Sequence, residues 1–313
     1  AGRAATPTII GEKMFTQEGL YSPNFYCLHA TNGSYVWGLQ LAETGISPAV
    51  YCKDVLLINT ASCTLYAIQA STGKLLWSKW LASYVYSTPS ADGESVFVVY
   101  SHGGYPVTVS FDLKTGEFNW MQRVDNEAIA CPVVDGDEVH VASQNGTYYV
   151  FNKDTGKLIK QSTTHKAVSS PTLTKDKIYL TATVGVSERL LVLDRKTLKV
   201  EKKYPTSMNS LKISGVRNVD ETDQMNFNGS HPIVYKNKVV LTTDASKIMA
   251  FDVASERLLW KKSIVANSDQ MPIVANDRVM ITSKSGRVMS YDIMTGNAQL
   301  VKQVTGDIEG QPI

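Results

Sequence analysis

The chain has 313 residues, of which 43% are hydrophobic and 19% are charged, a composition typical of a globular protein with a large buried core. Its formal net charge of +2 gives no indication of binding to nucleic acid or to an anionic membrane surface. No apolar stretch approaches the roughly 18 residues of a transmembrane helix, and no signal-peptide pattern begins at Ala1.

A proline preceded by small or polar residues recurs along the whole chain. The copies are Pro7, Pro48, Pro89, Pro132, Pro171, Pro232, Pro272 and Pro312. Successive copies are 39 to 43 residues apart, except for the 61 residues between Pro171 and Pro232. Repeats of about 40 residues are typical of solenoids and propellers.

Each repeat contains four short strand patterns separated by turn residues. In the second repeat the patterns are "SPAVY" (47–51), "DVLLINT" (54–60), "TLYAIQ" (64–69) and "LLWSKW" (75–80). The repeats leave no room for the crossover helices of a parallel sheet. We therefore predict an all-β fold, a β-propeller of four-stranded antiparallel blades. Seven repeats are complete, and "DIEGQPI" (307–313) reads as the first strand of an eighth. Seven blades are favoured, and eight remain the alternative.

The turn before the fourth strand has its own sequence motif. It starts at His29, Gln69, Asp112, Asn152, Asp194, Asp252 and Asp292 in the seven repeats. Four residues later a glycine occurs in five repeats, at positions 33, 73, 116, 156 and 296. Eight residues after the turn start a tryptophan occurs in four repeats, at positions 37, 77, 120 and 260.

The chemistry of this turn explains its residues. An Asp or Asn at the start accepts hydrogen bonds from backbone N–H groups further round the turn. Glycine permits the positive φ that the turn requires, and the tryptophan is expected to pack against the neighbouring blade. Leu198 and Glu256 replace the glycine in the fifth and sixth repeats, so we expect strained or differently shaped turns there.

The motif A-x-D-x-x-T-G-x-x-x-W resembles the repeat of the quinoprotein alcohol dehydrogenase-like, or PQQ-like, propellers. The resemblance covers residues 1–313 as one domain, with an insertion at 207–229 between repeats five and six. It implies either a pyrroloquinoline quinone (PQQ) dehydrogenase that also binds calcium, or a BamB-like propeller without a cofactor.

The sequence departs from the enzymes of that family. They often carry two adjacent cysteines against the quinone, whereas Cys27, Cys52, Cys63 and Cys131 are all separate in this chain. The residues before the repeat prolines are mostly small or neutral, which offers little to an anionic quinone. We therefore expect no PQQ, no calcium and no catalytic residue. The cysteines are expected to be mostly free, buried thiols, with up to two disulfides as the alternative.

Almost all irregular stretches fall on the edge of the blades opposite the Thr-Gly turns. They are residues 80–86, 101–106 and 183–188 and the insertion 207–229. Binding residues are often placed on loops of a rigid scaffold. The candidate partner-binding residues are Trp80, Tyr84, Tyr86, His102, Tyr105, Arg217, Asp220, Glu221 and Asp223.

Structural explanations compete with this assignment. Loop lengths can vary without a function, Trp80 can simply cover a blade junction, and the three acids can form a solvated turn. The five histidines lie in different repeats and are expected to be structural, with His231 near the central channel.

Taken together, the sequence favours a non-catalytic scaffold for protein–protein interaction. The resemblance implies an extracytoplasmic protein, periplasmic or secreted, with a role in cell-envelope or outer-membrane protein assembly as one instance. It would be a monomeric propeller or one domain of a larger protein. The alternatives are a PQQ- and calcium-dependent dehydrogenase and a carbohydrate-binding module that uses Trp80 and the tyrosines.

Overall fold

The computed structural model describes the greater part of the chain. The described residues are 7–19, 21–81, 88–124, 131–185, 187–204, 231–242, 247–255, 257–264, 272–282 and 287–303. They belong to two compact units, Ala1–Gln161 with Ile313, and Ser162–Pro312. Every regular element in these ranges is a β-strand. The described ranges contain no helix that is long and apolar enough to cross a membrane.

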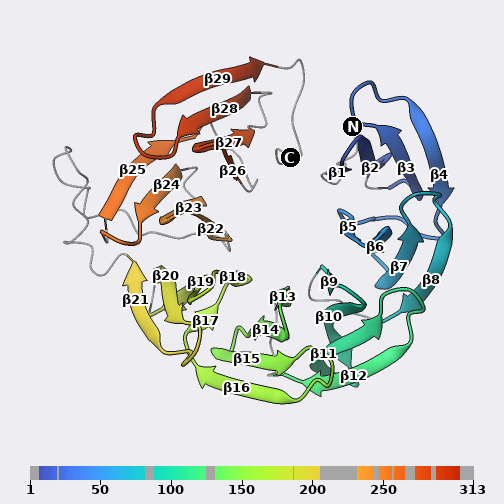
Figure 1. The fold of residues 1–313 in the computed structure, drawn as a ribbon, viewed down its shortest axis with the longest axis horizontal. Coiled ribbons are helices and arrows are strands. Elements are labelled where there is room, and N and C mark those ends of the chain that lie inside the picture. Colours follow the sequence, from blue (N-terminus) through green and yellow to red (C-terminus); the bar gives the residue numbers. More distant parts are fainter. Residues whose placement is uncertain are drawn as a thin grey trace. The chain divides into compact units, whose positions relative to one another are not determined.

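The first unit contains four antiparallel sheets, each with its four strands in sequence order (Figure 1). Blade 1 has β1 (Thr8–Ile10), β2 (Lys13–Gln17), β3 (Asn24–His29) and β4 (Tyr35–Gln40). Blade 2 has β5 (Val50–Cys52), β6 (Val55–Asn59), β7 (Thr64–Gln69) and β8 (Leu75–Trp80). Blade 3 has β9 (Ser90–Asp92), β10 (Ser95–His102), β11 (Tyr105–Asp112) and β12 (Phe118–Arg123). Blade 4 has β13 (Val133–Asp135), β14 (Glu138–Ala142), β15 (Thr147–Asn152) and β16 (Leu158–Thr163).

The second unit, considered by itself, contains three blades. Blade 5 has β17 (Lys166–Ala167), β18 (Thr172–Leu173), β19 (Lys177–Val184), β20 (Ser187–Asp194) and β21 (Val200–Tyr204). Blade 6 has β22 (Ile233–Tyr235), β23 (Lys238–Thr242), β24 (Lys247–Asp252) and β25 (Arg257–Ser263). Blade 7 has β26 (Ile273–Ala275), β27 (Arg278–Thr282), β28 (Arg287–Asp292) and β29 (Ala298–Gln303). In blade 5 both β17 and β18 pair with β19, so the innermost strand is divided in two.

The described residues thus form seven antiparallel blades, four-stranded apart from the divided innermost strand of blade 5, which confirms the predicted all-β, seven-bladed β-propeller. The segment 307–313, which the sequence suggests as the start of an eighth blade, lies outside the described residues, and so does the insertion 207–229.

Within each unit, the core consists of apolar layers between successive blades. The middle strands of the blades are buried on both faces, which requires apolar residues at successive positions. β6 accordingly contains the run "VLLI" and β10 the run "VFVVY". Val98 of blade 3 packs in one cluster with Leu57 and Leu65 of blade 2, while Phe97 faces the cluster shared with blade 4. Neighbouring blades thus bury each other's faces, which is the source of the repeat architecture's stability.

The four in-register tryptophans join blade 1 to 2, blade 2 to 3, blade 3 to 4 and blade 6 to 7. Each indole Nε1 donates a hydrogen bond to a backbone carbonyl in the Thr-Gly turn of the following blade. The pairs are Trp37 to Ala70 (3.0 Å), Trp77 to Leu113 (3.0 Å), Trp120 to Lys153 (2.7 Å) and Trp260 to Ile293 (2.9 Å). The packing of tryptophan on the neighbouring blade, predicted from the sequence, is confirmed. We call this contact a tryptophan junction.

The glycine of the turn is needed for the junction as well as for the backbone. A Cβ atom added at Gly73, Gly116, Gly156 or Gly296 would lie 2.5–2.7 Å from the indole of the preceding blade. At such distances the ring would have to shift. The same glycines have φ between +67° and +76°, in the left-handed region that other residues rarely adopt.

The turn of blade 5 shows how the chain manages without glycine. Leu198 has φ +57° and its N–H still donates to the Asp194 carbonyl at 2.8 Å, so the turn keeps its shape and is strained, as predicted. Glu256, the other exception, lies outside the described residues. In both cases the preceding repeat has a lysine, Lys160 or Lys202, where others have tryptophan. Glycine is thus absent where no indole has to be accommodated.

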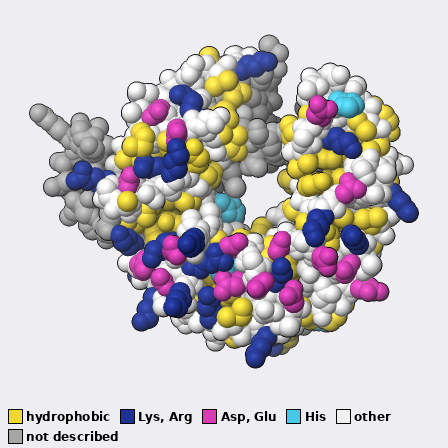
Figure 2. Space-filling model, viewed as in Figure 1, with side chains coloured by type: hydrophobic (Ala, Val, Ile, Leu, Met, Phe, Trp, Pro, Cys, Tyr) yellow, Lys and Arg dark blue, Asp and Glu magenta, His cyan; other side chains and the backbone are white. Residues whose placement is uncertain are grey.

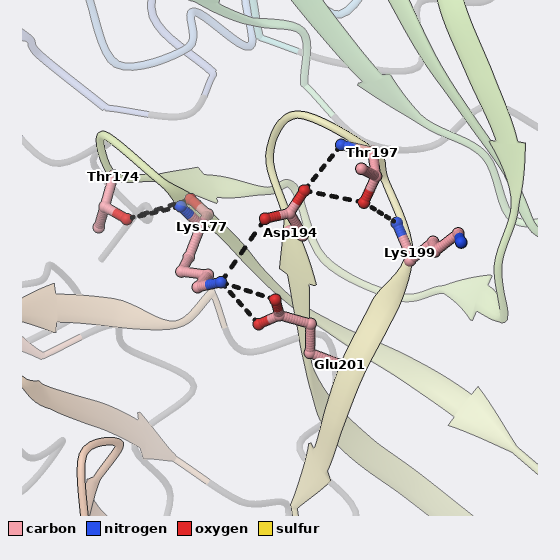
Figure 3. A network of polar contacts seen from close by, with 6 residues as sticks. All are labelled: Thr174, Lys177, Asp194, Thr197, Lys199 and Glu201. Carbon is pink, nitrogen blue, oxygen red and sulfur yellow. Dashed lines mark hydrogen bonds and ion pairs between the residues drawn. The ribbon is translucent and has the colours of Figure 1, made fainter.

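The carboxylate at the start of the turn has the predicted role. Figure 3 shows this in blade 5, where Asp194 Oδ1 accepts hydrogen bonds from the N–H and the hydroxyl of Thr197, each at 2.8 Å. Lys177 forms an ion pair with Glu201 at 2.7 Å and lies 3.7 Å from the other oxygen of Asp194. These hydrogen bonds lower the pKa of Asp194, with those from Thr197 contributing most.

Candidate partner-binding edge

Trp80 differs from the other tryptophans in its exposure. It is the last residue of β8, directly opposite Thr64 of β7, and 67% of its surface is exposed. The four junction tryptophans are 4–9% exposed. No described residue makes a hydrogen bond or ring contact with Trp80. It therefore presents an indole to solvent at the end of a rigid strand, on the edge of the blade opposite the Thr-Gly turn.

A second exposed aromatic lies on the same edge of the next blade. Tyr105 begins β11 and lies directly opposite His102, the last residue of β10. The guanidinium carbon of Arg123 lies 3.6 Å from the centroid of the Tyr105 ring, a close cation–π stack. Within the described residues, Arg123 has neither a hydrogen bond nor an ion pair. Arg123 is exposed, and the stack holds its guanidinium against the Tyr105 ring.

The turn between β6 and β7, on the same edge as Trp80, is held by the half-buried carboxylate of Glu43. Glu43 accepts hydrogen bonds from the hydroxyls of Thr60 and Ser62 and, at 2.9 Å, from Thr64. Burial opposes ionisation of Glu43, but these three hydrogen bonds outweigh it and lower its pKa. Thr64 is the cross-strand partner of Trp80, so the Glu43 network ties the strand next to the indole to the loop that carries Glu43.

Blade 1 adds Tyr21, which is 81% exposed in the turn between β2 and β3. The Glu18 carboxylate accepts hydrogen bonds from Ser22 (2.7 Å) and the side-chain amide of Asn24 (2.6 Å), which order this turn. These bonds, led by that from Asn24, lower the pKa of Glu18. We refer to Tyr21, Trp80, His102, Tyr105 and Arg123 as the aromatic edge.

Three of the nine sequence-predicted residues can thus be placed. His102 and Tyr105 meet at one hairpin of blade 3, and Trp80 lies on the corresponding edge of blade 2. The remaining six, Tyr84, Tyr86, Arg217, Asp220, Glu221 and Asp223, lie outside the described residues.

Sequence reasoning missed Arg123 and Tyr21. Arg123 follows Trp120 by three residues, as Trp80 follows Trp77, so the two occupy equivalent repeat positions. This equivalence could have identified Arg123 from the sequence as a candidate on the same edge as Trp80. Tyr21 lies in a turn rich in small and polar residues, where only its size marked it.

The charges on the visible face are mixed. Figure 2 shows acidic and basic side chains interspersed over the strands β13–β16, at the bottom of the view, without a patch of one sign. This distribution agrees with the net charge of +2 and does not favour a polyanionic partner on that surface.

The histidines and cysteines that can be placed include clear structural examples. The buried ring of His140 contacts the Tyr148 hydroxyl at 3.1 Å and Glu138 at 3.2 Å. Burial lowers the pKa of His231, so the neutral ring is favoured. All four cysteines are free thiols, and only Cys27 is fully buried.

The residues present do not match a quinone–calcium site. Across the described ranges, no three His, Cys, Asp or Glu side chains come together in a way that could hold a metal ion. The sequence has no adjacent cysteines to lie against a quinone.

The fold and its repeats define a PQQ-like repeat propeller, and the comparison with protein families agrees. The family described as outer membrane protein assembly factor BamB matches residues 24–120 and 98–300. The chain belongs to this family. No curated protein matches it.

Solved structures with the same fold include a BamB, a designed protein and dehydrogenases. BamB from Moraxella catarrhalis superimposes with a TM-score of 0.73 at 15% identity, over 99% of this chain and 88% of that one. The computationally designed Ika8 protein gives 0.72 at 12% identity, over 99% and 90%. A europium-containing methanol dehydrogenase gives 0.65 at 13% identity, over 97% and 79%. At these identities the likeness concerns the fold.

Proposed function

We propose that this protein is a non-catalytic scaffold of the cell envelope that binds a protein partner through the aromatic edge. The observation that carries the proposal is the exposed indole of Trp80 at the end of a strand whose neighbouring strand is tied to the Glu43 loop. The stacked Tyr105–Arg123 pair on the neighbouring blade supports it.

The physical basis is the energetics of protein interfaces. Trp, Tyr and Arg are the residues that most often dominate binding energy, because each buries a large rigid surface and still offers a hydrogen bond. Strand ends and tight hairpins hold these side chains in place before binding, so little conformational entropy is lost. The family description supports an extracytoplasmic location and a role in outer-membrane protein assembly.

The test is site-specific photo-cross-linking in the native host. A photoreactive residue at position 80 is compared with one at Tyr35, which is 66% exposed at the start of β4 on the opposite edge. We expect a defined protein adduct from position 80 and none from position 35. Trp80→Ala should weaken binding of that protein at least tenfold, and Arg123→Gln should weaken it less.

Three results would contradict the proposal. They are equal adducts from both positions, adducts with polysaccharide only, and micromolar, calcium-dependent binding of PQQ in a calorimetric titration. The second would favour the carbohydrate-binding alternative and the third the dehydrogenase. Unchanged far-ultraviolet circular dichroism and thermal midpoint in Trp80→Ala would show that any loss of binding is not caused by unfolding.

A further inference from the structure

Lys203, on the outer strand of blade 5, makes an unusual contact for a half-buried cation. Its Nζ lies 2.8 Å from Nε2 of His165, a residue of the segment that leads into β17. Among the described residues, no carboxylate lies within ion-pair distance of either side chain. A cation that is partly withdrawn from water is normally compensated by a negative charge, and here that charge is missing.

The contact requires a neutral imidazole. A lysine ammonium can only donate, so Nε2 of His165 accepts the hydrogen bond and the ring proton is on Nδ1. Burial, followed by the charge of Lys203, lowers the pKa of His165. Near neutral pH the pair therefore carries one positive charge, and protonation of the ring would place two cations side by side.

Strand alternation places a third basic side chain on the same face of blade 5. Lys203 lies opposite Leu191 of β20, and Arg189 is two residues from Leu191 on that strand. Arg189 and Lys203 are therefore diagonal neighbours on one face, with Cα atoms roughly 7–8 Å apart. Beside Arg189 this face continues with two short side chains, those of Ala182 and Ala167.

The carboxylates of blade 5 lie elsewhere. Glu188 shares the opposite face with Leu190, which packs in the core formed with blade 6. Three others lie toward the Thr-Gly edge, where Lys177 pairs with the last two of them (Figure 3): Asp176, Asp194 and Glu201. Lys166, the residue after the imidazole, adds a further positive charge. Among the described residues of this blade, the face that carries the basic side chains therefore has no acid to neutralise them.

We propose that Lys203, Arg189 and His165 form a binding site for a dianionic, tetrahedral oxyanion of the phosphate class. The two permanent charges of Lys203 and Arg189 match a free phosphate ion or a phosphate monoester, and a guanidinium can donate two N–H groups to it. A bound anion favours the imidazolium, so His165 takes up a proton and becomes a donor as well. The site shares no residue with the aromatic edge and does not depend on the proposed function.

Sulfate is the first probe, because it keeps its double negative charge between about pH 5 and pH 8, where histidine titrates. Any pH dependence of its binding then comes from the protein. Binding to the full chain is measured by isothermal titration calorimetry at constant ionic strength. Lys203→Met removes the charge and keeps the length of the side chain. Lys199→Met is the matched control, since Lys199 is an exposed lysine of the same blade (Figure 3).

We expect sulfate to bind roughly tenfold more tightly at about pH 5 than at about pH 8. Lys203→Met and Arg189→Met should each weaken binding by about tenfold or more, and Lys199→Met should leave it unchanged. His165→Gln keeps an acceptor for Lys203 but cannot be protonated, so it should bind sulfate and lose the pH dependence. In an NMR titration, added sulfate should raise the pKa of His165.

The source of the phosphate is decided with two further probes, inorganic phosphate and vesicles of phosphatidylcholine with phosphatidic acid. Binding of inorganic phosphate that is stronger than binding to the vesicles identifies a soluble phosphate. Sedimentation with the vesicles that exceeds binding of free phosphate, and that is lost in Lys203→Met, identifies a lipid headgroup. Vesicles of phosphatidylcholine alone are the control.

Three outcomes would overturn the proposal. The first is that sulfate, inorganic phosphate and phosphatidic acid all fail to bind. The second is an equal effect of Lys203→Met and Lys199→Met, which would indicate screening at the surface instead of a site. The third is acetate binding as tightly as sulfate, which would indicate a site for a carboxylate. Circular dichroism of each variant shows whether the fold is kept, and Arg189→Met replaces Lys203→Met if the latter does not fold.

Discussion

Each glycine of a tryptophan junction meets two requirements. Its own backbone needs a positive φ, and the indole of the preceding blade needs the space that a Cβ atom would fill. At Gly116 the φ is +70°, and the Trp77 ring occupies the place of the missing Cβ. The ring is anchored by its hydrogen bond to Leu113 and cannot move away without losing it. The free-energy costs of substituting Gly116 should therefore add, because one arises from strain in the turn and the other from steric overlap with the indole.

Gly116→Ala should therefore cost more stability than an ordinary glycine substitution. We expect a loss of roughly 2–4 kcal/mol in the free energy of unfolding, from left-handed strain plus overpacking. Gly136→Ala, with similar φ and no neighbour within 4 Å, should cost about 1 kcal/mol. Urea denaturation of both variants measures the difference. Equal losses would show that the indole contact adds nothing.

The acidic residue of the turn makes the folded state sensitive to pH. In blade 3 the pKa of Asp112 is lowered, first by the N–H of Thr115 and also by its hydroxyl and the N–H of Lys114. A lowered folded-state pKa stabilises the protein above the ordinary value of 3.8, and this contribution is lost as the pH falls through the folded-state value. Asn152 fills the same position in blade 4 without a charge.

Asp112→Asn should keep the turn and remove its share of the acid sensitivity. At pH 7 we expect little change in the unfolding midpoint, because the amide oxygen can accept the same N–H groups. Below pH 3.8 the variant should lose stability less steeply than the parent. Asp112→Ala should lose about 1 kcal/mol already at pH 7. Identical acid profiles for the parent and Asp112→Asn would contradict this account.

At the scale of the element, the blades are alike in strand order and differ in how they are joined. Blade 3 receives Trp77 from blade 2 and sends Trp120 to blade 4. Blade 5 has Leu198 in its turn and Lys202 at its own junction position. In repeat proteins, stability is approximately a sum of repeat and interface contributions. A blade without tryptophan junctions should therefore open at a lower free energy.

Hydrogen exchange can compare two hairpins of the same size. The hairpins β10–β11 and β19–β20 both consist of strands of eight residues. We expect amides of β19–β20 to exchange faster by native-state mass spectrometry. Trp77→Leu should accelerate β10–β11 toward the blade 5 rate and leave β19–β20 unchanged. Slower exchange in blade 5 than in blade 3 would refute the argument.

At the scale of the whole molecule, the five tryptophans divide into four that hold blades together and one that faces solvent. Collisional quenching should therefore detect one accessible indole in the native protein. Trp80→Phe should remove the quenchable, red-shifted part of the emission with little effect on stability. Quenching by acrylamide measures this, and binding of the partner should protect Trp80. A quenchable fraction that survives in Trp80→Phe would place the exposed indole elsewhere.

Much of this architecture could be predicted from the sequence because the fold is periodic. Proline, Asp or Asn, glycine and tryptophan keep their spacing over seven repeats, and each has a local physical role. Leu198 was predicted to be strained for the same reason.

The candidate site was less predictable. The Tyr105–Arg123 stack joins residues on different strands, and the Glu43 network depends on a loop approaching a turn of another blade. Neither contact follows a local period, so only the folded structure shows them.

The tryptophan junction also has a consequence for how such a chain can grow. Each of the first three repeats contains both halves of the contact, a glycine for the preceding neighbour and a tryptophan for the following one. Tandem duplication of any of these repeats would place the tryptophan of the first copy next to the glycine of the second copy. The new boundary would therefore have a tryptophan junction without any further substitution. Duplication of the fourth repeat would set Lys160 of one copy before Gly156 of the next, and a second substitution would be needed. The early part of the gene can therefore gain blades more readily than the part that encodes repeats four and five.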